Sequence, residues 1–274
     1  MKHSDQSKNQ VRAVMTIAGS DCSAGAGMQA DLKTFQHFGL HGLSAVTCIV
    51  SETANIVRRV DQVDPEMMED QILLMLDSFP LEVVKTGMLG SAKHVETVAS
   101  IFKNHPRIKL VIDPVMIAST GTPLIDKEAI TAYQEHFLPL AHIITPNLPE
   151  AETLLGNRIT SVSEMSSAAV KLTEKYGCAV LLKGGHLETN ECTDILYDGE
   201  KEHRFDSPRL DVSASHGTGC TLAAAVASML ARGENLPNAV ASAKAYLNRC
   251  LADSYSFTAP NGETIFALNQ GTSP

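Results

Sequence analysis

The 274-residue sequence has no tryptophan, no run of basic residues and no long hydrophobic segment. Its most apolar stretch, residues 222–231, falls well short of the roughly 20 residues that a membrane-spanning helix needs. The 22 Lys and Arg residues are outnumbered by 31 Asp and Glu residues, and the net charge is −9. Because nucleic acids and anionic membranes attract positive charge, we expect neither as a partner. Residues 1–10 are polar and lack the apolar core of a signal peptide, so we expect a cytoplasmic protein.

The cysteines are also spaced unlike those of zinc sites or disulfide frameworks. They are Cys22, Cys48, Cys178, Cys192, Cys220 and Cys250. No two of them form a C-x-x-C motif, so reduced thiols are the expected state. The Walker-type phosphate loop, G-x-x-x-x-G-K-[ST], is absent as well, which excludes the common P-loop nucleotide site.

Short apolar runs alternate with longer helical patterns along most of the chain. This alternation is typical of a parallel sheet with crossover helices. Strands are expected at residues 11–18, 44–50, 83–86, 108–112, 142–145 and 179–183, and helices at 25–38, 65–79, 94–103, 127–137, 149–155, 162–176, 217–232 and 237–252. The sequence therefore predicts an α/β fold with a mostly parallel central sheet.

The pattern changes around Asp198-Gly199, a dipeptide typical of a two-residue hairpin. Residues 194–197 and 202–205 flank it, so we expect a small antiparallel ribbon at one edge of the sheet. No linker-like stretch or repeat interrupts the chain, which predicts a single domain over residues 1–274. Within it, 1–10 is a polar extension and 255–274 a loosely patterned tail. The ribbon edge could pair in a homodimer, although a solvated ribbon explains the same residues.

The loops that follow the strands are expected to carry the chemistry, because ligands collect at the carboxyl ends of parallel strands. GAGMQA at residues 25–30 fits the dinucleotide fingerprint G-x-G-x-x-A, but residues 19–24 separate it from the preceding strand. No acidic residue ends the second strand at the ribose position. A nicotinamide-type oxidoreductase is therefore disfavoured against a glycine-rich helix start that lets the backbone approach a ligand or a neighbouring strand.

The segment SHGTGCTLAAA at residues 215–225 is a candidate anion site. Gly217 and Gly219 open an Ala-rich helix, whose first N–H groups and dipole can meet a negative charge. Cys220 lies in the first turn, where a helix N-terminus lowers the pKa of a thiol and favours the thiolate. A buried structural cysteine is the usual alternative. The position directly after the Gly-Thr-Gly turn favours a proton acceptor or a nucleophile.

Acidic and amide side chains follow two other predicted strands. Asp113 ends one strand, and Asn147 and Glu150 follow another. Their oxygens suit a hydrated Mg²⁺ that bridges nucleotide phosphates. Structural alternatives exist, because Asp113 could fix a turn and Glu150 could stabilise a helix N-terminus. Lys183 ends a buried strand before two glycines and is the candidate for neutralising a phosphate.

Together these loops resemble the hydroxymethylpyrimidine and phosphomethylpyrimidine kinases of thiamin biosynthesis. The resemblance rests on TIAGSDCSAGAGMQADLKTF at residues 16–35, KTGMLG at 85–90, DPVM, TPNLPEAE, KGGH and HGTGC, in this order. The related bacterial pyridoxal kinases share much of the pattern. The resemblance implies a three-layer α/β/α ribokinase-like fold. It also implies an ATP-dependent kinase that phosphorylates the hydroxymethyl group of 4-amino-5-hydroxymethyl-2-methylpyrimidine, and then the monophosphate.

The same resemblance implies a role for each candidate residue. Cys220 would be the catalytic base, and the backbone at Gly217 and Gly219 would form the anion hole. The remaining assignments are Lys183, His216 and Thr218 to ATP, Asp113, Glu150 and Asn147 to Mg²⁺ and its waters, and Gly19, Asp21, Asp31 and Glu52 to the substrate. These roles agree with the residue types, because phosphoryl transfer depends on positioning, charge neutralisation and one proton acceptor.

Three features depart from the family pattern. Glu52 replaces a glutamine of the pyrimidine kinases, and a carboxylate would repel a phosphorylated substrate. Ala118 stands where one group of pyridoxal kinases has a lid cysteine, which argues against an efficient two-cysteine pyridoxal kinase. The tail lacks the family's Gly-rich, His-containing end.

Two alternatives to the pyrimidine kinase therefore stay open. One is a pyridoxal or pyridoxine kinase, and the other is a non-catalytic protein that binds pyrimidine or vitamin B6 compounds. In each case the expected partner is a small pyrimidine or pyridine alcohol. Relatives commonly dimerise, so a homodimer is also expected.

Overall fold

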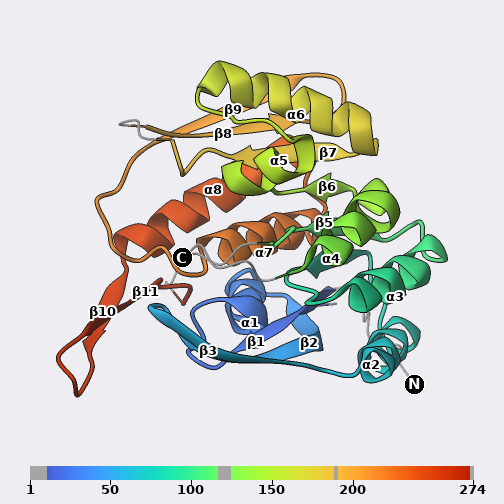
Figure 1. The fold of residues 1–274 in the computed structure, drawn as a ribbon, viewed down its shortest axis with the longest axis horizontal. Helices are drawn as coiled ribbons and strands as arrows, with labels where there is room; N and C mark the ends of the chain where they lie inside the picture. The colour runs from blue at the N-terminus through green and yellow to red at the C-terminus, as the bar shows by residue number, and fades with distance from the viewer. Residues whose placement is uncertain (1–10, 117–124, 188–190, 272–274) are drawn as a thin grey trace, which may run out of the picture.

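The computed structural model describes residues 11–116, 125–187 and 191–271 and is built around one large sheet (Figure 1). Its strand order is β3-β2-β1-β4-β5-β6-β7-β8-β9. The parallel strands are β1 (Ala13–Asp21), β2 (His41–Thr53), β4 (Val83–Thr86), β5 (Lys109–Ile112), β6 (Ile143–Ile144) and β7 (Ala179–Lys183). The antiparallel strands are β3 (Ile56–Gln62), β8 (Glu191–Tyr197) and β9 (Glu202–Pro208). The predicted parallel sheet and the edge ribbon at β8–β9 are thus confirmed.

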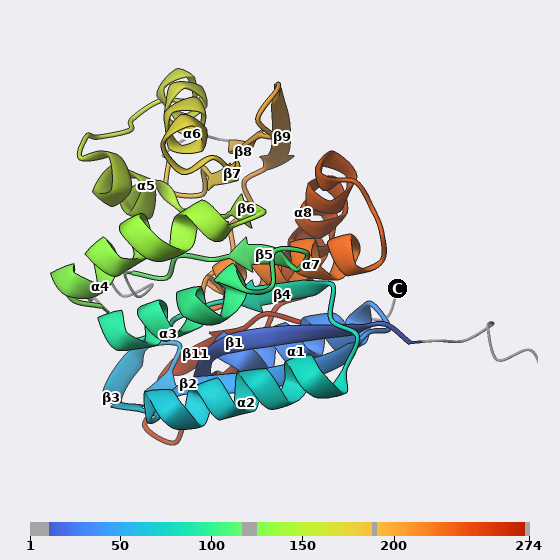
Figure 2. The ribbon, with the colours of Figure 1, turned by 90° about the vertical axis from the view of Figure 1, so that its right-hand side faces the viewer.

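Helices cover both faces of this sheet, which makes three layers (Figure 2). One face packs against α1 (Gly27–His37), α7 (Thr218–Ala231) and α8 (Leu236–Ala252). The other face packs against α2 (Pro65–Ser78), α3 (Ala92–Lys103), α4 (Lys127–Ala132), α5 (Leu148–Leu155) and α6 (Val162–Tyr176). The chain after α4 continues as a π-helical turn, Tyr133–Phe137, and a 3-10 turn, Leu138–Leu140. The predicted α/β/α architecture is confirmed.

Local sequence signals explain where these elements begin and end. Strands β4 and β5 are short and almost fully buried, as expected for parallel strands covered on both faces. Asp64, Ser91, Asp126, Asn147, Ser161 and Asn235 each accept a backbone N–H at a helix start. Helices α5 and α6 end at Gly156 and Gly177, whose φ angles of 76° and 72° suit glycine.

Two elements differ from the sequence prediction. Strand β2 continues to Thr53 and pairs with β3, an exposed arm whose mixed residues IVRRVDQ show no clear alternation. The tail after Ser254, expected to be loosely patterned, forms the hairpin β10 (Tyr255–Thr258) and β11 (Thr264–Ala267). Behind the hairpin, Leu268 and Gln270 are only 1% and 2% exposed. The sequence pattern does not predict how this tail is held, because single buried residues and not a repeated apolar pattern anchor it.

The predictions on the N-terminal extension and on the number of domains stay predictions. Residues 1–10 and Ala118 lie outside the described residues. The single domain over residues 1–274 stays a prediction. Within residues 11–116, 125–187 and 191–271, every helix is too short or too polar to span a bilayer.

Candidate active site

A cavity of about 720 Å³ opens at the carboxyl ends of the parallel strands. The candidate residues that line it are Gly19, Glu52, Asp113, Asn147, Glu150, Lys183, His216, Gly217, Thr218, Gly219 and Cys220. They come from the carboxyl ends of β1, β2 and β7, from the loops after β5 and β6, and from the starts of α5 and α7. The rule that ligands collect at this edge of a parallel sheet therefore located the pocket from sequence.

Helix α7 begins in the pocket with a tight backbone turn. Its N-cap, Gly217, has a φ of 82°, and a Cβ there would collide with the carbonyl oxygen of Gly25. A Cβ on Gly219 would lie 3.2 Å from Lys183 Nζ and 3.6 Å from Asp113 Oδ2. The first turn of α7 thus lies directly against a lysine–aspartate pair. A helix N-terminus, together with the lysine, suits an anion.

The lysine beside this turn is tied to a single carboxylate oxygen. Lys183 Nζ lies 2.9 Å from Asp113 Oδ1, and Thr145 Oγ1 donates to the same oxygen at 3.1 Å. The lysine side chain is 14% exposed and the aspartate side chain 3%. Burial acts to lower the pKa of Lys183, but Asp113 and Glu150 raise it overall. Lys183 is therefore a positive charge at the pocket wall.

Glu150 and Asn147 are both engaged at the start of α5. Each donates its backbone N–H to the side chain of the other, at 2.8 and 2.9 Å, so the structural alternative for Glu150 is present. Burial, with Asp113 adding to it and Lys183 opposing it, raises the pKa of Glu150 to about 7. No group of three His, Cys, Asp or Glu residues in the described ranges could hold a metal alone. Asp113 and Glu150 instead fit a Mg²⁺ that one or two carboxylates share with phosphates and waters.

Cys220 faces the pocket from the first turn of α7. Burial raises the pKa of Cys220 to about 11, with Asp31 and Asp113 adding to this and Lys85 and the backbone N–H of Gly27 opposing it. Burial thus opposes the thiolate that the sequence predicts, because desolvation outweighs the helix N-terminus.

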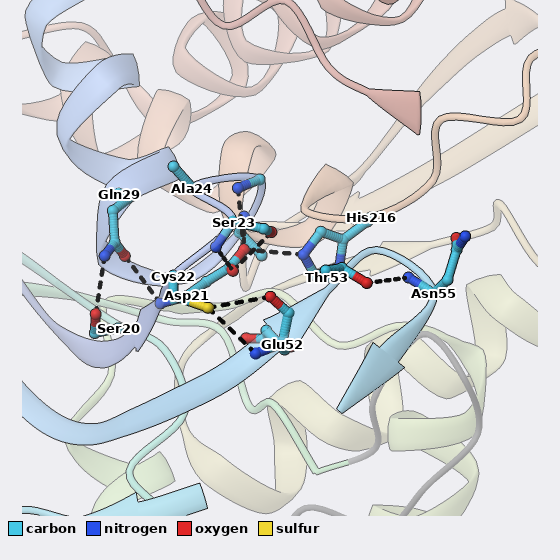
Figure 3. A network of polar contacts seen from close by, with 12 residues as sticks. Ser20, Asp21, Cys22, Ser23, Ala24, Gln29, Glu52, Thr53, Asn55 and His216 are labelled. Carbon is cyan, nitrogen blue, oxygen red and sulfur yellow. Dashed lines mark hydrogen bonds and ion pairs between the residues drawn. The ribbon is translucent and has the colours of Figure 1, made fainter. Parts of the chain in front are cut away.

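The loop after β1 wraps around the carboxylate of Asp21 (Figure 3). This carboxylate accepts the backbone N–H groups of Ser23, Gly25 and Ala26 at 2.7 to 3.0 Å, and His216 Nε2 lies 3.0 Å from it. Burial acts to raise the pKa of Asp21, but these hydrogen bonds hold it well below its usual value. Asp21 is not among the residues that line the pocket, and its carboxylate holds the loop and contacts His216.

Glu52 lines the pocket from the carboxyl end of β2, one residue before the strand ends. Its backbone is paired with Cys22, whose thiol donates to the Glu52 carbonyl oxygen at 3.2 Å and accepts the Glu52 N–H at 3.4 Å (Figure 3). Burial, with the charge of Asp21 adding to it and His216 opposing it, raises the pKa of Glu52. Gly19 lies deeper, where a Cβ would meet Cys48 Sγ at 2.6 Å.

Asp31, which the resemblance assigns to the substrate, is not among the residues that line the pocket. Its two carboxylate oxygens lie 3.0 and 2.8 Å from Lys85 Nζ, and Thr16 Oγ1 donates to one of them at 2.6 Å. All three residues are fully buried. Sequence reasoning missed Lys85, which does line the pocket. The available signal was a lone charged residue inside the otherwise buried strand β4.

The fold is that of a ribokinase-like kinase, with a glycine-containing helix start beside the pocket at the carboxyl edge of a parallel sheet. The family model described as phosphomethylpyrimidine kinase matches residues 21–264, and the chain belongs to that family. The family-level resemblance inferred from the loops is therefore confirmed.

Individual relatives agree with this assignment. The chain is 38% identical to the hydroxymethylpyrimidine/phosphomethylpyrimidine kinase of Haemophilus influenzae, over 93% of this chain and 97% of that protein. It is 43% identical to a thiamine biosynthesis bifunctional protein of Geobacter sulfurreducens, over 87% of this chain. The chain spans about half the length of that protein and of two further curated relatives. The Staphylococcus aureus pyridoxal kinase in complex with AMP-PCP and pyridoxal superposes with a TM-score of 0.85 at 33% identity, covering 96% of this chain and 94% of that one.

Proposed function

We propose that this chain transfers the γ-phosphoryl group of ATP to the hydroxymethyl group of 4-amino-5-hydroxymethyl-2-methylpyrimidine, and then to the monophosphate. The observation that carries the proposal is the convergence of three groups in one pocket. These are the N-terminus of α7, the charged Lys183 and the Cys220 thiol. Family membership supports the reaction class and the pyrimidine substrate.

Charge neutralisation and positioning account for most of phosphoryl-transfer catalysis. In the proposed reaction the nucleotide phosphates meet Lys183 and the backbone of Gly217–Gly219, with His216 and Thr218 beside them. When bound, Mg²⁺ would neutralise phosphate charge, held by Asp113 and Glu150 with Asn147 next to them. Structures of Staphylococcus aureus pyridoxal kinase contain AMP-PCP or ADP, which supports ATP as the donor.

Cys220 is the proposed proton acceptor. As the substrate oxygen forms its bond to the γ-phosphorus and the bond to the β-phosphate oxygen breaks, the hydroxyl proton moves to Sγ. Cys220 must first release its own proton to water in the pocket, because the thiol form accepts none. Lys85 and the Gly27 N–H are the groups in the structure that favour the thiolate.

Pyridoxal is the second candidate substrate, because a pyridoxal kinase with bound pyridoxal shares this fold over almost the whole chain. Pyridoxal also presents a hydroxymethyl group on a six-membered nitrogen heterocycle. Its support is no stronger than that of the pyrimidine, which the family model and the curated relatives favour.

A substrate screen with the full chain separates these possibilities. Mg-ATP is incubated with hydroxymethylpyrimidine, its monophosphate or pyridoxal, and ADP release and the phosphorylated product are measured. We expect turnover on both pyrimidines. Efficient turnover on pyridoxal alone would replace the proposal with the second kinase. Tight binding of a pyrimidine without ADP release would replace it with a non-catalytic binding protein.

Three expectations from the sequence accompany this proposal. The chain is proposed to be a cytoplasmic, single-domain protein that forms a homodimer. Sedimentation equilibrium of the full chain tests the last of these, since a dimer has twice the mass of 29.4 kDa that the sequence gives. A monomer at micromolar concentration would overturn the proposed homodimer.

A further inference from the structure

The end of the described chain is anchored beside the candidate active site. After the β10–β11 hairpin, Asn269 N donates to the Cys250 carbonyl oxygen of α8 at 3.2 Å. Tyr246 Oη, also on α8, donates to the backbone oxygen of Gln270 at 2.8 Å. Leu268 packs into the core formed with α7 and α8. Both α8 contacts hold the backbone of this segment and leave the Gln270 side chain to make other contacts.

The buried amide of Gln270 joins two pieces of the active site. Its Nε2 donates to the Gly25 carbonyl oxygen at 3.0 Å and to Thr221 Oγ1 at 3.3 Å. Gly25 belongs to the loop before α1, and Thr221 lies in the first turn of α7, next to Cys220. Gln270 is 2% exposed, so both of its amide protons are used away from water. One side chain therefore ties the loop to the helix.

The loop that Gln270 holds also reaches the thiol. The backbone N–H of Gly27 acts to lower the pKa of Cys220. Gly27 has a φ of 56°, and a Cβ there would lie 2.5 Å from the Gly19 carbonyl oxygen. At Gly217, a Cβ would collide with the Gly25 carbonyl oxygen, so the loop and the α7 start are in direct backbone contact. A shift of Gly25 would therefore move both the donor to the thiol and the anion-binding turn.

We propose that Gln270 is a positioning residue for phosphoryl transfer, which holds the loop at Gly25 against Thr221 of α7 and thereby positions the neighbouring Cys220. The proposal rests on the proposed function, because it gives Cys220 the role of proton acceptor. Gln270 touches neither nucleotide nor substrate in this account. Its contribution is to the geometry of the reacting thiol.

The first test compares Gln270→Met with Asn269→Ala. Methionine has a similar length and no donor, so the buried Gly25 carbonyl loses its partner. We expect kcat to fall roughly tenfold to 100-fold, because small displacements of a reacting group cost that much. KM for ATP should change less than kcat, because Lys183 and Asp113, which also meet the nucleotide, lie on β7 and after β5 and are not held by Gln270. Asn269→Ala keeps the backbone anchors of the tail and should retain kcat. Unchanged kcat in Gln270→Met would overturn the proposal.

The second test is a double-mutant cycle with Cys220→Ala. If Gln270 acts through the thiol, Gln270→Met should lower the residual kcat little further once the thiol is gone. An equal fold-loss in both backgrounds would show general loosening of the pocket and overturn the proposal. Unfolding by urea, followed for every variant, ensures that each assay is made on folded protein.

A third readout does not depend on turnover. The rate of alkylation of Cys220 by iodoacetamide is followed against pH by mass spectrometry, with the partly exposed Cys192 of β8 as the internal control. Displacement of the loop and its Gly27 N–H should move the Cys220 profile to higher pH and leave the Cys192 profile in place. Identical Cys220 profiles in wild type and Gln270→Met would overturn the proposal even if the kinase activity is confirmed. A shifted profile without pyrimidine turnover would support the positioning and reject the proposed function.

Discussion

Two buried lysine–aspartate pairs lie near the pocket, and they are satisfied to different degrees. Lys85 contacts both carboxylate oxygens of Asp31, with Thr16 donating to one of them, and the pair is fully buried. Lys183 is ion-paired with one oxygen of Asp113 and is 14% exposed at the pocket wall. Lys85 and Asp31 thus form a closed pair, which is fully buried and joins α1 to β4. Lys183 and Asp113 form an open pair, which is partly exposed and faces the pocket.

The position of each pair in the fold explains this difference. Asp31 lies on the buried face of α1, which covers β1, so its carboxylate is enclosed against Lys85 of β4. Lys183 ends β7, where Gly184 and Gly185 follow and the first turn of α7 approaches. In each pair burial acts to lower the pKa of the lysine, and its carboxylate neighbours raise it overall. Both lysines therefore stay charged, but only Lys183 is placed to exchange part of its pairing for a phosphate.

The largest effect on stability is expected when the closed pair is broken. Asp31→Asn leaves the Lys85 ammonium buried without a counter-charge, which should lower the free energy of unfolding by about 3–5 kcal/mol. Urea unfolding measures this. The matched double substitution Asp31→Leu with Lys85→Met removes both charges and should recover most of the loss. A decrease below about 1 kcal/mol for Asp31→Asn would contradict the view that this pair is closed to water.

Breaking the open pair should affect the reaction more than the fold. Lys183→Met removes the charge that meets the phosphates, and kcat/KM should fall about 10²–10³-fold, as for other preorganised donors. The loss of unfolding free energy should be smaller than for Asp31→Asn, because water in the pocket can solvate Asp113. Steady-state kinetics and urea unfolding check both parts. Near-normal kcat/KM with a loss of stability as large as that of Asp31→Asn would reverse the comparison.

Asp21 is a third carboxylate near the pocket, and it differs from the two pairs because it accepts mainly backbone N–H groups. The pKa of Asp21 is depressed in the folded protein, so its stabilisation is present above about pH 4 and is lost as pH falls further. Asp21→Asn should lower the free energy of unfolding at pH 7 by about 1–3 kcal/mol. The difference in free energy of unfolding between Asp21→Asn and the wild type should become smaller when unfolding is measured near pH 3. A difference that is independent of pH would contradict the assigned role of the charge.

Much of the fold and the pocket could be predicted from sequence, because both follow from local patterns. Apolar strands such as residues 108–112 and 179–183 fix a parallel sheet, and its carboxyl edge collects Asp113, Lys183 and Cys220. Contacts between distant segments could not be predicted. The enclosure of Asp31 by Lys85 and the anchoring of Gln270 depend on which side chains meet in the folded chain. The protonated state of Cys220 likewise depends on burial, which its place at a helix start does not reveal.

The central claim is that Cys220, beside the open Lys183–Asp113 pair, accepts the proton during phosphoryl transfer. The most direct test is kcat of Cys220→Ala with hydroxymethylpyrimidine, measured alongside the Kd for Mg-ATP by calorimetry. A general base contributes about 10²–10⁴-fold, so kcat should fall by that factor while the Kd stays close to that of the unsubstituted protein. Full activity in Cys220→Ala would contradict the claim.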